Sequence, residues 1–577
     1  MKKIPIMLLS GFAAYLVLAG FRPTEPIVPT TDQYILIAWN DLGMHCANLD
    51  FTNMCILPPF NNQFAHVIRK GDATRPPLAV NGTAGIYVTY EIPGNSYSAG
   101  KTNFWSYTQH LFGVVLQPNI GMTGNGMTGT LVKNDALNYQ IVTGIPNTAF
   151  PDGTPTISYP YQLTLMKAWS PDGILLATTQ SVIPVSHEIN CVSAGCHASE
   201  LAILQEHDQV PGFNIADKPI LCASCHSDNA LGTPGQQGVP PFSQAIHEKH
   251  GGFINTGTIT DCYKCHPGPD TQCWRDIMHT TSGLITKCQD CHGSVEWVGH
   301  SIDEGREPWL EQPSCGAANC HGPQYAEEPG KLFRESKGHG GLFCSTCHNS
   351  PHAILPSTLA ADNLQNINLQ GFSGTLSQCS VCHGYTPAGN GPHGIPAIQP
   401  VQNVTITSGQ SSCYNATQVI TVAGNGSSFV MLPGSNATFI SGKTISFLPG
   451  TLVQPGGHLK GYITSIGRYC NNPLPPFAPL AMASEENDAS NQDLSAWFKV
   501  YPNPSSVSVT IEFKPRHTGN LSFIKIFDTY GQEIFSTKMQ IQAAITIPLQ
   551  DQADGMYIIS VTSQERTVFQ KIIKLKE

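Results

Sequence analysis

The segment Cys222-Ala223-Ser224-Cys225-His226 is one of seven copies of a motif that lie between residues 191 and 383. Five copies have the spacing C-x-x-C-H, and two, the first and the fifth, have the wider spacing C-x4-C-H. The cysteines are Cys191, Cys196, Cys222, Cys225, Cys262, Cys265, Cys288, Cys291, Cys315, Cys320, Cys344, Cys347, Cys379 and Cys382. The histidine that follows each second cysteine is His197, His226, His266, His292, His321, His348 or His383.

This pattern matches the chemistry of c-type haem attachment. Two thiols form thioethers with the haem vinyl groups, and the adjacent histidine then lies under the iron as its proximal ligand. A single C-x-x-C pair could equally be half of a zinc site or a redox pair. Seven copies with histidine in the same register favour haem, so the sequence predicts a heptahaem cytochrome c domain over residues 186–396, with about seven covalently attached haem c groups.

Little polypeptide is available to surround each predicted haem, because successive motifs begin only 26 to 40 residues apart. We therefore expect the haems to pack closely, with short helices and little regular structure around them. Residues 199–208 and 241–250 are the predicted helices.

A second axial ligand decides whether a haem transfers electrons or binds substrate. The distal candidates are His187, His207, His247, His250, His279, His300, His339, His352 and His393, with Met278 as a competitor. Nine histidines for seven irons allow every haem to be closed by two histidines, which favours electron transfer over catalysis. His247 and His250 are three residues apart, so they do not match the zinc-protease motif, which needs a spacing of four.

Composition and charge restrict the compartment and the partners. The net charge is −10 and only 12% of residues are charged, so nothing indicates nucleic-acid binding. Residues 1–20 combine two lysines with an apolar run that is short for a membrane span, which predicts a secretory signal peptide. The chain is thus expected to be exported.

Residues 32–185 are predicted to form an N-terminal all-β domain, because short apolar or alternating runs are separated by turn signals. Candidate ligands in and near its first half are Met44, His45, Cys46, His66 and His110, which include residue types that suit copper. His45 could alternatively reach a haem iron. The alternative is a buried aromatic cluster with a disulfide between Cys46 and Cys55, and both interpretations stay open.

Two segments carry a family resemblance, Asn-Asp-Leu-Gly-Met-His-Cys at 40–46 and the motif region 262–276. Both resemble multihaem c-type cytochromes of bacteria, a likeness that implies haem but no particular activity. In the second segment Cys273 is expected to be buried or in a disulfide. Arg275 could pair with a haem propionate or form a surface salt bridge.

After residue 396 the composition shifts to Thr, Ser, Val, Gly and Asn, with short strands at even spacing. Residues 401–472 resemble the small stacked β modules that precede sorting domains in bacterial surface proteins. The resemblance implies a disulfide between Cys413 and Cys470 that closes the module. Residues 473–496, rich in Pro, Ala, Ser and Asn, are predicted to be a linker.

Residues 497–577 contain Tyr501-Pro502-Asn503-Pro504, followed by strand patterns expected of an Ig-like β-sandwich. With Gly555-Met556-Tyr557 and the closing Lys-Ile-Ile-Lys at 571–574, they resemble a type A C-terminal sorting domain of the type IX secretion system. The resemblance implies export across the outer membrane by that machinery and a location at the cell surface or outside the cell.

Together these patterns predict a multidomain extracellular or cell-surface cytochrome that transfers electrons along bis-histidine haems. Its partners would be other redox proteins or extracellular electron acceptors, and self-association into a filament is a further expectation. One alternative is a multihaem oxidoreductase that converts a small nitrogen or sulfur compound at one open haem. Another is a surface adhesion or binding protein.

Overall fold

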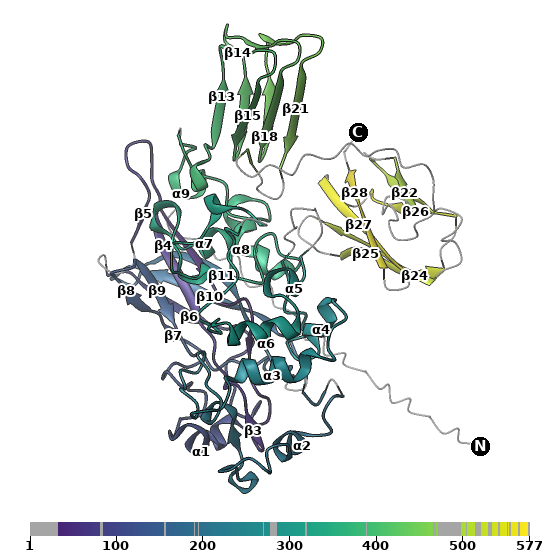
Figure 1. Cartoon of the computed structure of the whole chain (residues 1–577). Helices are drawn as coiled ribbons and strands as arrows, with labels where there is room; N and C mark the ends of the chain where they lie inside the picture. Colours follow the sequence, from purple (N-terminus) through teal and green to yellow (C-terminus); the bar gives the residue numbers. More distant parts are fainter. Residues whose placement is uncertain are drawn as a thin grey trace, which may run out of the picture. The chain divides into compact units, whose positions relative to one another are not determined.

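The computed structural model describes residues 33–470 and 498–574, except for short gaps at 81–84, 155–156, 190, 194, 269, 277–285, 318–319, 388, 465–468, 503–504, 514–520, 529–532, 541–542, 551, 553–554 and 564–565. The predicted signal peptide, the linker, Met278 and His279 lie outside the described residues. The chain divides into two compact units, Met1–Pro475 and Pro476–Glu577 (Figure 1). A multidomain, mostly β architecture is confirmed.

The N-terminal region forms two facing sheets. The first has the order β1 (Tyr34–Trp39), β4 (Gln63–Arg69), β9 (Tyr139–Val142), β8 (Val132–Asn134), with β5 (Leu78–Ala79) beside β4. The second has the order β2 (His45–Cys46), β11 (Leu175–Ser186), β10 (Tyr161–Trp169), β6 (Tyr87–Glu91), β7 (Gly129–Thr130). A hydrophobic core shared by both sheets lies between them.

Strand β1 is buried on both faces, since its side chains alternate between two clusters. Leu36 and Ala38 point into the core between the sheets, whereas Ile35 and Ile37 pack against Leu376 and Val381 of the motif region. The outer face of the first sheet therefore supports part of the region that carries the cysteine motifs.

The N-terminal region is not purely β, which corrects the sequence prediction. Its aromatic segment folds into η1 (Phe104–Ser106) and α1 (Thr108–Phe112), and Phe104 packs on Phe51 at 5.2 Å between ring centroids. A further strand, β3 (Met54–Cys55), pairs in parallel with β12 (Ile220–Leu221), just before the second motif. This pair joins the N-terminal region to the motif region.

The motif region is built from short helices, as expected, although it contains more of them than the two predicted. They are α2 (Glu200–Gln205), α3 (Phe242–Gly251), α4 (Ile259–Tyr263), α5 (Cys288–His292), α6 (Val295–Asp303), α7 (Cys344–His348), α8 (Ala360–Gln370) and α9 (Ser380–His383). The 3₁₀ turns are η2 (Ile215–Asp217), η3 (Cys222–Ser224), η4 (Pro323–Tyr325), η5 (Phe333–Glu335), η6 (His339–Gly341) and η7 (Pro392–Gly394). None of the described helices is long and apolar enough to cross a membrane.

The predicted helices α2 and α3 lie where the sequence placed them, within one residue at the N-terminal side. Ser199 caps α2, because its hydroxyl oxygen accepts a hydrogen bond from the Ala202 N–H at 3.1 Å. Helix α3 begins directly after Pro241.

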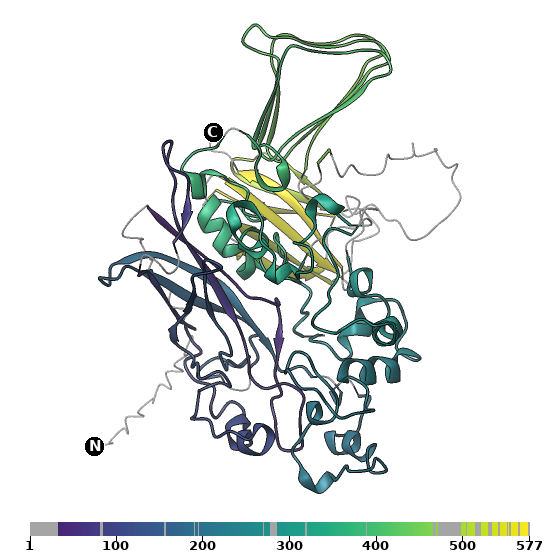
Figure 2. The ribbon, with the colours of Figure 1, turned by 60° about the vertical axis from the view of Figure 1, so that its left-hand side comes forward.

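The module after residue 396 is a parallel β-solenoid with a triangular outline (Figure 2). Each strand pairs with the third strand that follows it, so three sheets form. They are β13 (Ile398–Val401), β16 (Val419–Val422), β19 (Thr444–Phe447); β14 (Val404–Ile406), β17 (Phe429–Met431), β20 (Thr451–Val453); and β15 (Ser411–Ala416), β18 (Asn436–Ser441), β21 (His458–Ile463). Phe429 and Phe439 pack at 5.5 Å in its core.

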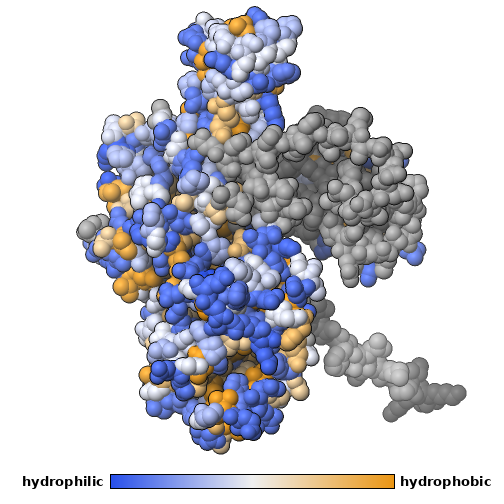
Figure 3. Space-filling model, in the orientation of Figure 1, coloured by the Kyte–Doolittle hydropathy of each residue, from blue (hydrophilic) through white to orange (hydrophobic). Residues whose placement is uncertain are grey.

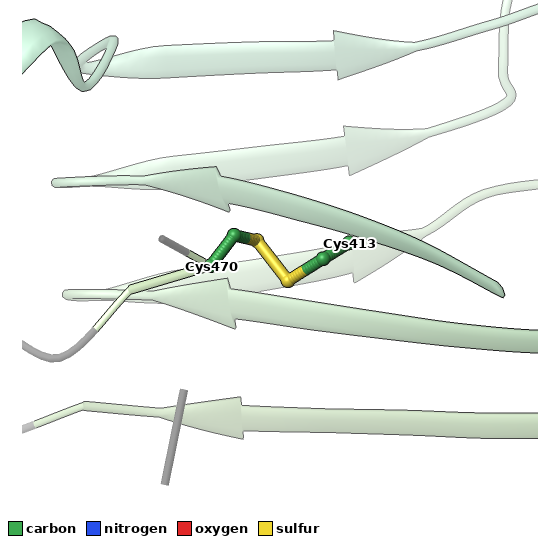
Figure 4. The surroundings of a disulfide bond; sticks show 2 residues. All are labelled: Cys413 and Cys470. Atoms are coloured by element: carbon green, nitrogen blue, oxygen red, sulfur yellow. A yellow bond between two sulfur atoms is a disulfide. The ribbon is translucent and has the colours of Figure 1, made fainter. Parts of the chain in front are cut away.

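The disulfide implied for this module is confirmed. Cys413 on β15 is bonded to Cys470, with an S–S distance of 2.03 Å and a Cα–Cα distance of 5.7 Å (Figure 4). The bond closes a segment of 57 residues that contains the solenoid strands from β15 onward.

The second unit contains two sheets around one core. They are β22 (Phe498–Tyr501), β23 (Ser508–Phe513), β26 (Ala544–Pro548) and β25 (Glu533–Gln540), β24 (Leu521–Asp528), β27 (Gly555–Ser563), β28 (Arg566–Lys574). Ile511 of the first sheet and Ile526 of the second belong to the same buried cluster. Its assignment as Ig-like stays a prediction.

Candidate functional site

Each short motif is wound into a single helical turn, which explains its spacing. Residues i, i+3 and i+4 of a helix share one face, so the turn brings both thiols and the imidazole to the same side. Helices α5 and α7 each span a whole motif. In three others the histidine N–H donates to the carbonyl of the first cysteine, at 3.0 Å for His226, 2.8 Å for His266 and 2.9 Å for His383.

The two wide motifs close with the same hydrogen bond. The His197 N–H donates to the Cys191 carbonyl at 3.1 Å, and the His321 N–H donates to the Cys315 carbonyl at 3.2 Å. The two additional residues are therefore accommodated within the loop, while the histidine returns to the first cysteine as in the short motifs.

Six motif histidines face a second histidine from elsewhere in the chain. The distances between ring centroids lie between 6.0 and 6.4 Å. The pairs are His197 with His250, His226 with His207, His266 with His247, His292 with His352, His348 with His393, and His383 with His339. All six second members are predicted distal candidates.

This separation fits two imidazoles on opposite sides of one metal. A metal–nitrogen bond of about 2 Å, with the nitrogen about 1.1 Å from the ring centre, gives centroids roughly 6.2 Å apart. Two rings stacked in direct contact could lie closer, as Tyr325 and His393 do at 4.8 Å. The six histidine pairs thus leave room for an iron between them.

Hydrogen bonds hold five of these imidazoles by the nitrogen Nδ1. A backbone carbonyl can only accept, so Nδ1 carries the proton and Nε2 keeps a free lone pair. The donors and their carbonyls are His207 to Ile203 at 3.2 Å, His226 to Pro240 at 2.8 Å, His247 to Ser243 at 2.6 Å, His250 to Ile246 at 2.7 Å, and His352 to Leu42 at 3.2 Å. Metal-bound histidines are commonly oriented in this way.

Burial keeps several of these rings neutral, the form in which imidazole binds a metal. Burial and then the neighbouring His247 lower the pKa of His266 to about 4. The pKa of His348 and that of His352 are also lowered to about 4, mainly by burial. Burial conversely raises the pKa of the Cys222 and Cys347 thiols to about 12, so these cysteines stay protonated.

The motif region has little apolar core of its own. Among its described residues between 186 and 396, the buried hydrophobic side chains are Leu204, Ala223, Ile254, Phe343, Ala353, Leu355, Leu376, Val381 and Ile395. The surface over α3 and α6 is mainly hydrophilic (Figure 3). Nine buried apolar side chains are few for about two hundred residues, which fits a region whose interior is completed by a large apolar cofactor.

Other distal candidates lie away from the motif histidines. His187 packs on Phe150 at 4.9 Å, and His300 is exposed and lies 3.4 Å from the Glu304 carboxylate. His279 is outside the described residues. The fifth motif histidine, His321, has the Tyr325 ring, four residues further along the chain, at 5.9 Å.

The N-terminal candidate ligands are not brought together. His45 Nε2 lies 2.8 Å from the Asp41 carboxylate, and His110 Nε2 donates to the Asp217 carbonyl at 2.7 Å. His66 is buried: its Nδ1 donates to the Asn138 carbonyl at 2.8 Å, and its Nε2 accepts from a backbone N–H. In the described part of the chain, no group of three or more His, Cys, Asp or Glu side chains is arranged to hold a metal ion by itself.

The disulfide considered between Cys46 and Cys55 is absent, because both are free thiols. Cys46 lies at the end of the second sheet, where burial and then the neighbouring Cys273 raise its pKa to about 12. Cys55 instead lies beside Cys222 of the second motif. Cys273 was expected to be buried or in a disulfide. It is a half-buried free thiol, so the disulfide is absent.

Arg275 forms a salt bridge, but a buried one and not the expected surface one. Its guanidinium makes two hydrogen bonds to the Asp362 carboxylate, at 2.7 and 3.1 Å, and both side chains are buried. It also donates to the Gly43 carbonyl at 2.7 Å. Arg275 thus connects the N-terminal region, through Gly43, to the motif region, through Asp362.

Comparison with known proteins bears on the C-terminal unit. A family model described as a secretion system C-terminal sorting domain matches residues 499–575. No curated protein matches the chain. The sorting domain implies interaction with the type IX secretion machinery and export to the cell surface or the extracellular space.

Proposed function

We propose that this exported protein is a multihaem c-type cytochrome that transfers electrons along about seven haems. The observation that carries the proposal is the set of six histidine pairs with centroids 6.0 to 6.4 Å apart, each with one member from a cysteine motif. Haem c supplies an iron that alternates between the ferrous and ferric states.

The chain's own residues would attach, orient and close these sites. The two thiols of each motif lie on the same side of a helical turn as the histidine, as attachment through two thioethers requires. The carbonyls that accept from Nδ1 fix the ring orientation and leave Nε2 for the iron. At the six paired sites the two imidazoles would both hold the iron, so such a site would exchange electrons and leave no place for a substrate.

Export supports the partners that we propose. A sorting domain directs the protein to the cell surface or beyond, where other redox proteins or extracellular electron acceptors would exchange electrons with it. Haem would be attached outside the cytoplasm, where cysteine thiols tend to pair as disulfides. The cysteines of the described motif region form no disulfides, so their thiols could form thioethers instead.

The alternative function is that of a multihaem oxidoreductase that converts a small nitrogen or sulfur compound at one open haem. Catalysis of this kind needs a vacant axial position on an iron.

A haemochrome count and a spin-state measurement on the purified full-length protein test the proposal. We expect seven covalent haems, all low-spin. His250→Ala should convert one haem to high-spin, while the control His300→Ala should leave the spectrum unchanged, because His300 is exposed beside Glu304. Fewer haems than the five short motifs would overturn the proposal, and a high-spin haem in the unaltered protein would favour the oxidoreductase.

A further inference from the structure

Helix α3 provides the distal histidines of two different motifs. His247 faces His266 of the third motif at 6.1 Å, and His250 faces His197 of the first motif at 6.1 Å. These two histidines are three residues apart, so their positions differ by about 4.5 Å along the helix axis. The first and third motifs are therefore neighbours, although the second motif lies between them in the sequence.

The third and fourth motifs meet at their first cysteines. The Cys262 and Cys288 thiols lie beside each other. Around them, the Lys287 ammonium donates to the Gly257 carbonyl and the Gln289 amide donates to the Thr258 carbonyl, so the turn that precedes α4 packs against α5.

Aromatic and apolar contacts connect the last three motifs. The Tyr325 ring lies 5.9 Å from His321 of the fifth motif and 4.8 Å from His393, which faces His348 of the sixth motif. Cys347 of the sixth motif and Cys382 of the seventh pack in the same hydrophobic cluster on β1.

The first and second motifs are also neighbours, because His207, which faces His226 of the second motif at 6.4 Å, lies only ten residues after His197 of the first motif. The fourth motif adjoins the last three. His352 faces His292 of the fourth motif at 6.3 Å and lies four residues after His348 of the sixth motif. In Figure 1 α2 lies at the lower end of the motif region, below α3, α4 and α5.

We propose that the first four haem sites form a line in the order second, first, third, fourth, and that the last three sites continue it from the fourth. The inference rests on the proposed function, since it requires haem at each motif. The second site is then one end at which redox partners exchange electrons with the line. The seventh site adjoins the N-terminal region, where the Gly71 N–H donates to the Cys382 carbonyl at 2.8 Å.

Electron paramagnetic resonance of the oxidised full-length protein tests this order. The first site is removed by Cys191→Ala with Cys196→Ala, and the second by Cys222→Ala with Cys225→Ala. Removing the first site should leave the second magnetically isolated, with the slow spin relaxation of a single haem. Removing the second site should leave all remaining haems coupled. An isolated first haem after removal of the second site would show that the line follows the sequence and would overturn the proposal.

A haemochrome count separates failure of this order from failure of the proposed function. Each variant should hold one haem fewer than the unaltered protein, whereas an unaltered protein without haem would refute the function itself. Two variants that keep every cysteine provide a second measurement. His250→Ala should place a high-spin iron beside two neighbours and change the relaxation of two haems. His207→Ala should change the relaxation of one, and two changed haems in this variant would contradict the assignment of the second site as an end.

Discussion

The buried ion pair between Arg275 and Asp362 gives the sharpest stability prediction. The two side chains are 4% and 1% exposed, so water cannot replace either partner. Arg275 also donates to the carbonyls of Gly43 and Cys273, and its guanidinium carbon lies 4.4 Å from the Tyr161 ring centroid. Removal of the carboxylate charge would leave a buried cation held only by neutral groups.

Asp362→Asn keeps the shape of the side chain and removes its charge. Breaking a buried pair in this way costs about 3–5 kcal/mol, because the remaining charge is uncompensated. We expect a loss of this size in the free energy of unfolding, measured by urea denaturation with far-ultraviolet circular dichroism. The double variant Arg275→Met with Asp362→Leu should recover most of it, since apolar side chains can replace a buried pair.

Asp72→Asn provides a matched control. Asp72 pairs with Arg75 at 2.6 Å, but both side chains are exposed, so the urea midpoint should barely change. If Asp362→Asn lowered the free energy of unfolding by less than about 1 kcal/mol, the Arg275 pair would behave like a solvated one, and its role in joining the two regions would be refuted.

Three further predictions concern the N-terminal region and the solenoid. Gly43→Ala should lower the thermal midpoint far more than Gly113→Ala. Both glycines have positive φ, but only at Gly43 would a Cβ meet a backbone carbonyl oxygen, 1.8 Å away. Equal shifts of the two midpoints would contradict this. Burial raises the pKa of Asp152, but hydrogen bonds from the buried Lys101 ammonium and from Ser96 lower it by more. Asp152→Asn should therefore destabilise the protein at neutral pH. That contribution is present above the unfolded pKa of about 3.9 and is lost as pH falls through the lower folded value, so a difference that persisted in strong acid would refute it. Cys413→Ser should cost the solenoid about 4 kcal/mol in urea denaturation, and a reductant that failed to produce the same loss in the unaltered protein would argue against the disulfide.

The motifs could be predicted from sequence because their geometry is local. A turn of helix fixes the positions of Cys344, Cys347 and His348 whatever surrounds it. The pairing of the second histidines could not be predicted, because His352 reaches His292 and His250 reaches His197 across more than fifty residues. Only the packed chain brings them together, and no local pattern records the partner.

Candidate ligands in the N-terminal region show that residue type alone does not predict a metal site. His45, His66 and His110 are suitable residue types, yet each is engaged separately, by the Asp41 carboxylate, the Asn138 carbonyl and the Asp217 carbonyl. Buried histidines can satisfy their hydrogen bonds in this way without any metal. Residue type without a diagnostic spacing therefore carried little information there.

The solenoid shows why strand prediction alone does not give topology. Its strands were recognisable from composition, but parallel pairing of each strand with the third one after it depends on contacts about one turn of the solenoid away. Tyr414 of one turn and Phe439 of the next stack at 5.1 Å only because successive turns pair in register. The pattern of short strands is also compatible with an antiparallel sandwich, which the sequence could not exclude.

The two wide motifs differ from the other five in the number of residues between their cysteines. Their local geometry shows whether that difference matters. A count of intervening residues treats Cys191 and Cys315 as exceptions. The hydrogen bond from the motif histidine N–H to the first cysteine carbonyl is nevertheless present at 3.1 and 3.2 Å, close to the values in the short motifs. What attachment requires is that two thiols and an imidazole reach one side of the turn, and loops of two lengths can satisfy that requirement. Loops of either length therefore return the histidine to the first cysteine, so the wider spacing does not by itself argue against a motif.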